Sequence, residues 1–140
     1  MAFQHDDNRE LFEWVKTQLP PEAVIAKDSR IRLPEPGNPQ DAERFGPLPQ
    51  KVLGGKFAAD IGTIEELRKQ GVTHVAVSES DYGRFFLRSL RPKKDEEAAF
   101  ARRKAFYEDL LRQGESVFEK ERGTVLYLHP GIRLYRLPAD

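Results

Sequence analysis

The segment 71–81 constrains the fold of this chain more than any other stretch of the sequence. Gly71 is suited to end a helix, because glycine adopts the left-handed backbone conformation of helix ends at low cost. The run that follows, 72–78 (VTHVAVS), is rich in apolar residues, which is typical of a strand covered on both faces. The polar cluster 78–81 (SESD) can begin the next helix. The segment therefore predicts the central strand of an α/β sheet, and α/β proteins place their sites at the carboxyl ends of such strands.

Capping boxes and prolines divide the rest of the chain. Asp7 with Glu10, and Thr63 with Glu66, have the spacing of helix starts. The expected helices lie at 7–19, 63–70, 80–91 and 95–113, with a proline-rich loop at about 33–50 and a turn at 129–131. The expected strands lie at 23–26, within 51–60, and at 72–78, 116–119, 125–128 and 132–137. Within 51–60 we favour 56–59 as the paired part, with 52–53 as an extended lead-in. Helices between strands force parallel pairing. We expect a single α/β domain over residues 1–140, three-layered and Rossmann-like, with a mostly parallel sheet and antiparallel edge strands at the C-terminus.

Polar residues follow the strands that are expected to be parallel. They are Asp28, Asp60, Ser78, Glu79, Ser80 and Asp81. Because parallel strands end at one edge of a sheet, these side chains could converge on a ligand or on Mg²⁺ or Ca²⁺. Serine and aspartate also cap helices, and capping alone accounts for the same residues, so both interpretations stay open. Four arginines could contact an anion near this edge: Arg30, Arg32, Arg84 and Arg88.

Several classes of chemistry find no support in the sequence. The chain has no cysteine, which excludes disulfides, thiolate nucleophiles and cysteine-based zinc sites. The stretch 54–57 (GGKF) lacks the serine or threonine that follows the lysine of a phosphate-binding loop, and no dinucleotide-binding or serine-hydrolase motif is present. His5, His74 and His129 do not have the spacing of zinc ligands. We expect no catalytic residue, no metal and no cofactor, with His74 a structural histidine and Trp14 a core residue.

The balance of positive and negative residues argues against a partner that is attracted by the net charge of the chain. Lys plus Arg and Asp plus Glu each number 23, so no net field favours nucleic acid or anionic lipid. Residues 1–7 have neither the basic nor the apolar region of a signal peptide. No apolar run reaches the roughly 18 residues of a membrane span. We expect a soluble chain that binds no nucleic acid and does not itself insert into a membrane.

Four stretches, taken together, resemble a known family. They are 11–28 (LFEWVKTQLPPEAVIAKD), 71–78 (GVTHVAVS), 106–119 (FYEDLLRQGESVFE) and 129–137 (HPGIRLYRL). In this order they resemble the soluble C-terminal domain of multi-spanning glycosyltransferases of the protein-mannosyltransferase and aminoarabinose-transferase-like class. The resemblance implies an extracytoplasmic accessory domain whose partner is the membrane-embedded part of the enzyme. It also implies that the catalytic acidic residues and the polyprenyl-phosphate-sugar site lie in membrane-proximal loops outside this chain, so no catalytic residue is carried over.

Three functional hypotheses result. The first is a non-catalytic accessory domain of a membrane glycosyltransferase that recognises an acceptor or a protein partner. The second is a small stand-alone α/β enzyme or ligand-binding protein with its site at the carboxyl ends of the strands. The third is a protein-interaction module that uses the proline-rich loop. The first places the chain on the extracytoplasmic face of a membrane, and the others are compatible with the cytoplasm.

Overall fold

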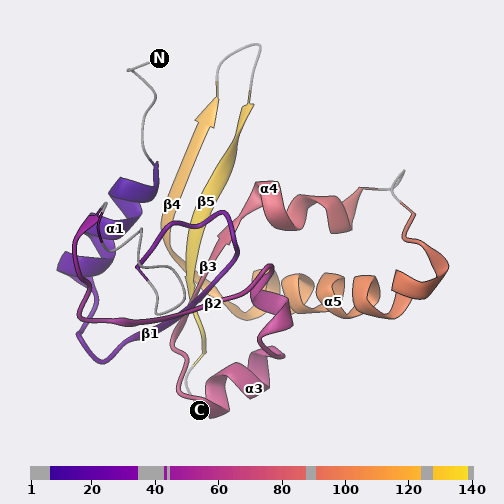
Figure 1. Ribbon diagram of the computed structural model, residues 1–140, viewed down its shortest axis with the longest axis horizontal. Coiled ribbons are helices and arrows are strands. Elements are labelled where there is room, and N and C mark those ends of the chain that lie inside the picture. The colour runs from indigo at the N-terminus through magenta and orange to yellow at the C-terminus, as the bar shows by residue number, and fades with distance from the viewer. Residues whose placement is uncertain (1–6, 35–42, 44, 88–90, 124–127, 139–140) are drawn as a thin grey trace.

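The computed structural model describes residues 7–34, 43, 45–87, 91–123 and 128–138 (Figure 1). The elements, with 3-10 helices written as η, are α1 (Asp7–Gln18), β1 (Val24–Lys27), β2 (Lys51–Gly54), η1 (Ala58–Asp60), α3 (Ile64–Lys69), β3 (His74–Ser78), α4 (Glu79–Tyr82), η2 (Gly83–Phe86), η3 (Lys94–Glu96), α5 (Glu97–Gln113), β4 (Glu115–Gly123) and β5 (Leu128–Arg136). Among the described residues, no helix is long and apolar enough to cross a membrane.

Five strands form one mixed sheet in the order β2-β1-β3-β5-β4 (Figure 1). β1 is parallel to β2 and to β3, whereas β5 is antiparallel to β3 and to β4. β3 lies in the middle, and all five of its residues are buried. The predictions of an α/β class, of a central strand at 72–78 and of antiparallel C-terminal strands are confirmed. Parallel and antiparallel pairings are equal in number, so the sheet is mixed rather than mostly parallel.

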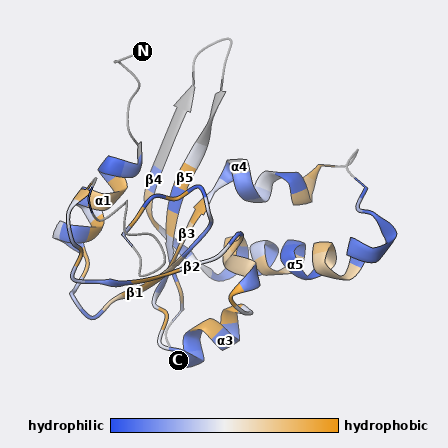
Figure 2. Cartoon of the chain, in the orientation of Figure 1, coloured by the Kyte–Doolittle hydropathy of each residue, from blue (hydrophilic) through white to orange (hydrophobic). Residues whose placement is uncertain are grey.

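Side chains of the sheet alternate between two hydrophobic clusters, because consecutive residues of a strand point to opposite faces. Ile25 and Ala76 belong to the cluster that contains the buried residues of α1. Ala26 and Val75 belong to the cluster that contains the buried residues of α3 and α5. Figure 2 shows the hydrophobic residues of β1 and β3 at the centre of the molecule. Burial on both faces explains the nearly continuous apolar runs of these two strands.

The first helix ends where the prolines predict. Pro20 and Pro21 follow the end of α1, and the residue before a proline is pushed out of the helical conformation. The side chain of Gln50 then donates hydrogen bonds to the carbonyl oxygens of Val15 and Leu19, at 3.1 and 2.9 Å. The Leu19 carbonyl gains a partner that the helix end does not provide, the Val15 carbonyl already accepts the Leu19 N–H, and both bonds join α1 to the start of β2.

The strand predicted within 51–60 is confirmed by β2, but the prediction that 56–59 is its paired part is wrong. The paired residues are those of β2, 51–54, and the chain then turns into η1. The reason is a hydrogen bond from a distant part of the chain. The backbone N–H of Ala58 donates to a carboxylate oxygen of Asp28 at 2.7 Å, so it is not available to a neighbouring strand.

The helix predicted at 80–91 is much shorter than expected. α4 and η2 together reach only Phe86, and the chain is extended at Leu87. The predicted residues 88–90 lie outside the described part of the chain, as does most of the proline-rich loop at 33–50. The helix predicted at 95–113 is confirmed, with η3 forming its first turn and Gly114 following its end.

The turn predicted at 129–131 is also wrong, because β5 runs through these residues. Pairing between β4 and β5 shifts register between Lys120, which faces Ile132, and Arg122, which faces His129. Such a bulge adds a residue to one strand and tolerates Pro130, which lacks a backbone N–H. β3 pairs with β5 only from Ile132 onward, so β3 requires no hydrogen bond from the proline. The strand predicted at 116–119 is confirmed as part of β4, and residues 125–127 lie outside the described part.

Gly114 lies where the chain leaves α5 and enters β4. A Cβ atom there would lie 2.8 Å from the carbonyl oxygen of Leu110 and 3.1 Å from two carbons of Tyr135. We expect Gly114→Ala to lower the free energy of unfolding, measured in urea, by about 1–3 kcal/mol through overpacking. At Gly83 the nearest atom to an added Cβ is Glu79 Cγ at 3.9 Å, so Gly83→Ala should change stability by less than about 1 kcal/mol. Equal stability of Gly114→Ala and the wild type would contradict this packing.

Candidate functional site

Three of the six residues predicted from the strand ends meet at the carboxyl ends of β1 and β3. Asp28 directly follows β1, Ser78 is the last residue of β3, and Asp81 lies in α4. The backbone N–H of Asp28 donates to the carbonyl of Ala76 at 3.1 Å, which extends the parallel pairing to this point. From β1 the sheet continues to β2 on one side and to β3 on the other. This position is therefore the topological switch point, where open α/β sheets commonly bind ligands.

The carboxylate of Asp28 is fully buried and accepts hydrogen bonds from three elements. Its Oδ1 accepts from the Ala58 N–H at 2.7 Å and from the Tyr107 hydroxyl at 2.5 Å. Its Oδ2 accepts from the Ser78 N–H at 3.2 Å. Burial raises the pKa of Asp28 to about 7, the Asp81 carboxylate acts in the same direction, and the hydrogen bonds oppose them. Asp28 therefore connects β1 to η1, β3 and α5.

Asp81 is the second buried carboxylate of this cluster, with 3% of its surface exposed. Its Oδ2 accepts from the backbone N–H of Arg30 at 3.0 Å, and its Oδ1 accepts from the Ser29 hydroxyl at 3.3 Å. The Arg30 Nε lies 3.6 Å from Oδ1. Asp81 thus anchors the segment that follows β1. Both carboxylates are engaged in holding the fold together.

The other predicted residues do not join this cluster. The carboxylate of Asp60 accepts two hydrogen bonds from Arg103, at 2.8 and 3.1 Å, and one from Arg102 at 3.1 Å. It therefore faces α5. Glu79 is exposed in the first turn of α4, and the side chain of Ser80 lies outside the described part of the structure. Within the described residues, no group of three or more His, Asp or Glu side chains could hold a metal ion.

Ser78 and Asp81 do not cap the helix that follows β3 through their side chains, and a hydrogen bond to a distant residue takes that place. Ser78 occupies the N-cap position of α4, but its side chain makes no capping hydrogen bond, and Asp81 lies inside the helix. Instead, Asp28 accepts the N–H of Ser78 and the N–H of Ala58, the first residue of η1. One carboxylate from the end of β1 therefore satisfies backbone donors at the starts of two other elements.

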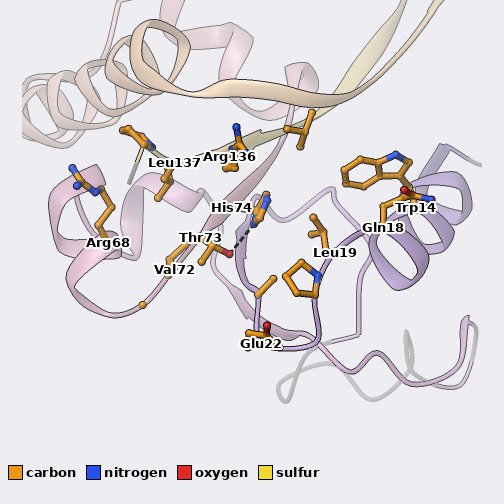
Figure 3. A pocket seen from close by; sticks show the side chains of 15 residues that line it. Trp14, Gln18, Leu19, Glu22, Arg68, Val72, Thr73, His74, Arg136 and Leu137 are labelled. Atoms are coloured by element: carbon orange, nitrogen blue, oxygen red, sulfur yellow. Dashed lines mark hydrogen bonds between the residues drawn. The ribbon is translucent and has the colours of Figure 1, made fainter. Parts of the chain in front are cut away.

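A separate cavity of about 680 Å³ lies at the opposite end of β1 and β3. We call it the Trp14 cavity. Figure 3 shows Trp14 and Arg68 on opposite sides of it, with Thr73 and His74 between them. Its remaining walls come from the end of α1, from β4 and from the end of β5, and they include Leu19, Val117, Arg136 and Leu137. The lining is apolar with a few polar groups, which is the usual character of a small-molecule site.

His74 and Thr73 present a fixed polar group to the Trp14 cavity. The Thr73 hydroxyl lies 2.7 Å from His74 Nδ1 and is held to the backbone of Val24 at 3.1 and 3.2 Å. Burial, together with the positive charge of Arg136, lowers the pKa of His74 to about 4. The imidazole is therefore neutral near pH 7 and can exchange hydrogen bonds with a ligand.

Trp14 supplies the aromatic surface of this cavity. It is half-buried, and its ring centroid lies 5.7 Å from that of Phe118 at an interplanar angle of 53°. The contact with β4 holds the indole in place, while part of the ring lines the cavity. The sequence pattern on α1 predicted a core residue here. The pattern identifies the inward face of a helix, but it does not show that the neighbouring elements leave a space beside it.

No protein-family model, no curated protein and no solved structure matches this chain. The resemblance to glycosyltransferase domains therefore rests on the sequence stretches alone.

The contact between the Tyr107 hydroxyl and Asp28 joins residues 79 positions apart, so no local sequence pattern predicts it. Tyr107→Phe removes that donor from a buried carboxylate, so we expect the free energy of unfolding to fall by about 1.5–3 kcal/mol. The control is Tyr82→Phe, which removes a part-buried hydrogen bond from Arg133, with an expected cost of about 0.5–1.5 kcal/mol. Urea denaturation of both variants measures the difference. A Tyr107→Phe protein as stable as the wild type would rule out the proposed role.

His74 and Asp28 should make the free energy of unfolding depend on pH in opposite directions. The pKa of His74 falls on folding, from 6.5 to about 4, so the folded state binds fewer protons and loses stability as the pH drops through this window. The pKa of Asp28 rises on folding, from 3.8 to about 7, so its contribution falls as the pH rises through a similar window. Between about pH 7 and about pH 5, His74→Gln should remove roughly 1–2 kcal/mol of acid destabilisation.

Asp28→Asn should show the reverse change, with a larger loss of stability on acidification than the wild type, because a stabilising protonation is absent. The measurement is the free energy of unfolding at several pH values for the three proteins. Parallel curves for His74→Gln and the wild type would contradict a neutral buried imidazole.

Proposed function

We propose that this chain is a non-catalytic recognition domain that binds a saccharide in the Trp14 cavity, as the accessory domain of a membrane glycosyltransferase. The observation that carries the proposal is the cavity itself, which combines an indole surface with a neutral histidine and polar groups along its walls. Its volume, about 680 Å³, is within the range of roughly 300–1,000 Å³ that is usual for small-molecule sites.

The chemistry of the lining supports a saccharide. A sugar ring has an apolar C–H face, which packs against an aromatic ring, and hydroxyl groups at its edge, which need hydrogen-bond partners. Trp14 and Leu137 offer the apolar contacts. His74, Gln18 and Arg136 offer donors and acceptors around them. A purely apolar ligand would cover the remaining hydrogen-bonding positions of these groups without replacing their water, which costs binding free energy.

The arrangement of the carboxylates supports a binding role rather than catalysis. Asp81 lies close enough to Asp28 to raise the pKa of its carboxyl group. The oxygens of both carboxylates nevertheless accept hydrogen bonds from backbone and side-chain donors of the fold. Neither residue lines the Trp14 cavity. The acid and base groups that the sequence singled out therefore lie apart from the proposed saccharide.

The finer architecture belongs to the same proposal. A three-layer, Rossmann-like arrangement is supported by α1 in the cluster on one face of the sheet and by α3 and α5 in the cluster on the other. The parallel strands β2, β1 and β3 form its regular half. The resemblance supports a membrane-embedded glycosyltransferase as the partner and an extracytoplasmic location, with the cavity presenting part of the acceptor.

Trp14 is the single tryptophan of the chain, so its fluorescence reports directly on the cavity. We expect a hexose, a pentose or an amino sugar to change its emission saturably at micromolar to millimolar concentration. Arg136→Gln should weaken binding by about five- to tenfold, the effect of losing one hydrogen bond to the ligand. Arg112→Gln is the matched control, since both arginines are exposed and ion-paired with a neighbouring carboxylate, but Arg112 lies outside the cavity.

Two results would overturn the proposal. One is an emission spectrum that no member of the sugar panel changes. The other is equal weakening by Arg112→Gln and Arg136→Gln. Calorimetric titration of the same proteins provides a readout that does not depend on the fluorophore.

A further inference from the structure

A second cavity, with a different chemistry, lies beyond the carboxyl ends of β2 and β3. Its volume is about 320 Å³, and we call it the basic cavity. Its walls come from the segment after β2, from η2 and from the start of α5, and they comprise Lys56, Phe57, Arg84, Phe85, Arg91, Pro92, Lys93, Glu96, Phe100 and Arg103. Figure 1 shows η2, which follows α4, beside α5. The Trp14 cavity lies at the other end of β3, so the two sites are distinct.

The basic cavity concentrates positive charge in a chain whose total charges are balanced, 23 against 23. Five of its lining residues are Lys or Arg, and one is Glu. Arg103 is ion-paired with Asp60 at 2.8 Å. The other four cations form no ion pair with any residue that the structure describes: Lys56, Arg84, Arg91 and Lys93. Glu96 and the Asp60 partner of Arg103 offset only part of this charge, so the cavity keeps a net positive charge that favours a bound anion.

Phe57 organises three of these cations. The Cζ atoms of Arg103 and Arg84 lie 4.7 and 5.4 Å from the centroid of its ring, and Lys56 Nζ lies 5.8 Å from it. The ring is buried and packs edge-on against Phe85, with the centroids 5.1 Å apart. Cation–π contacts attract the three positive groups to one place. The ring therefore holds the charges together in the absence of a ligand, which lowers the entropy cost of binding.

The start of α5 adds to the positive potential at this cavity. Glu96, the N-cap residue, lines the cavity, and its side chain makes no capping hydrogen bond. The first N–H groups of a helix have no partner within the helix and, together with the helix dipole, favour an anion. The carboxylates of Glu96 and Glu97 lie at the same helix end and offset part of this potential, so the cationic side chains are the main attraction for an anion.

We propose that the basic cavity binds a phosphoryl group, carried by a phosphate monoester or diester. Several cations that form no ion pair within the described part of the chain match the charge of a phosphoryl group better than the single charge of a carboxylate. The guanidinium groups of Arg84 and Arg91 can each give two parallel hydrogen bonds to its oxygens. This site differs from a phosphate-binding loop, because side chains from three segments rather than one glycine-rich backbone supply the contacts. The proposal does not depend on saccharide binding at the Trp14 cavity.

The phosphoryl group could belong to a soluble ester or to a lipid headgroup, and two arms of one experiment separate these sources. The first arm is calorimetric titration of the full chain with inorganic phosphate and with glycerol 3-phosphate, at physiological salt. The second is co-flotation with phosphatidylcholine vesicles that contain or lack phosphatidic acid. Saturable binding in the first arm assigns a soluble ester, and binding only to vesicles with phosphatidic acid assigns the headgroup.

Matched lysine variants locate the site. Lys56 lines the basic cavity after β2, whereas Lys51 is exposed at the opposite end of the same strand. We expect Lys56→Gln and Arg84→Gln each to weaken binding by roughly tenfold, the effect of losing one charge-assisted hydrogen bond. Lys51→Gln should bind as the wild type does. All three side chains are exposed, and unchanged circular dichroism would verify folding.

Three outcomes would overturn the proposal: no saturable binding in either arm, equal weakening by Lys51→Gln and Lys56→Gln, or full affinity in Lys56→Gln and Arg84→Gln. Trp14 emission should not change when phosphate binds, because the two cavities share no lining residue. The saccharide and phosphoryl proposals can therefore fail independently.

Discussion

The carboxylate of Asp28 is the interaction on which the rest of the structure depends. A buried carboxylate is tolerated only where hydrogen bonds replace the lost water, and here the donors come from η1, β3 and α5. The same bonds divert the chain after β2 into η1, satisfy the N–H at the start of α4, and dock α5 through Tyr107. The removal of any one donor leaves part of a buried charge without a partner.

This arrangement closes the position where an open α/β sheet most often binds its ligand. Asp28 and Asp81 fill the switch point between β1 and β3 with groups that already have partners. Space for ligands remains at both ends of the strands. At the amino ends, the lining of the Trp14 cavity is mainly apolar, with an indole and a few polar groups, and beyond the carboxyl ends, the lining of the basic cavity is cationic. The two cavities suit ligands of different chemistry.

The sequence predicted part of this site. The meeting of Asp28, Ser78 and Asp81 followed from the rule that parallel strands end at one edge, and it needed only the positions of two strands. Asp60 was misplaced because its strand was assigned five residues too late, and its carboxylate pairs with α5 instead. Arg84 was identified as a possible anion contact, but Arg91, Lys93 and Lys56 were not, because no local pattern links residues so far apart.

The sequence by itself determined the elements whose signals are local. The capping box at Thr63, the proline stop after α1, the apolar run of β3 and the glycine after α5 act on neighbouring residues, so they can be read without a partner. Only the tertiary structure decided where β2 ends, how β5 passes through Pro130 and which side chains enclose the two cavities. Each of these depends on a hydrogen bond, a strand register or a surface supplied by a distant segment, and local propensity carries no information about such partners.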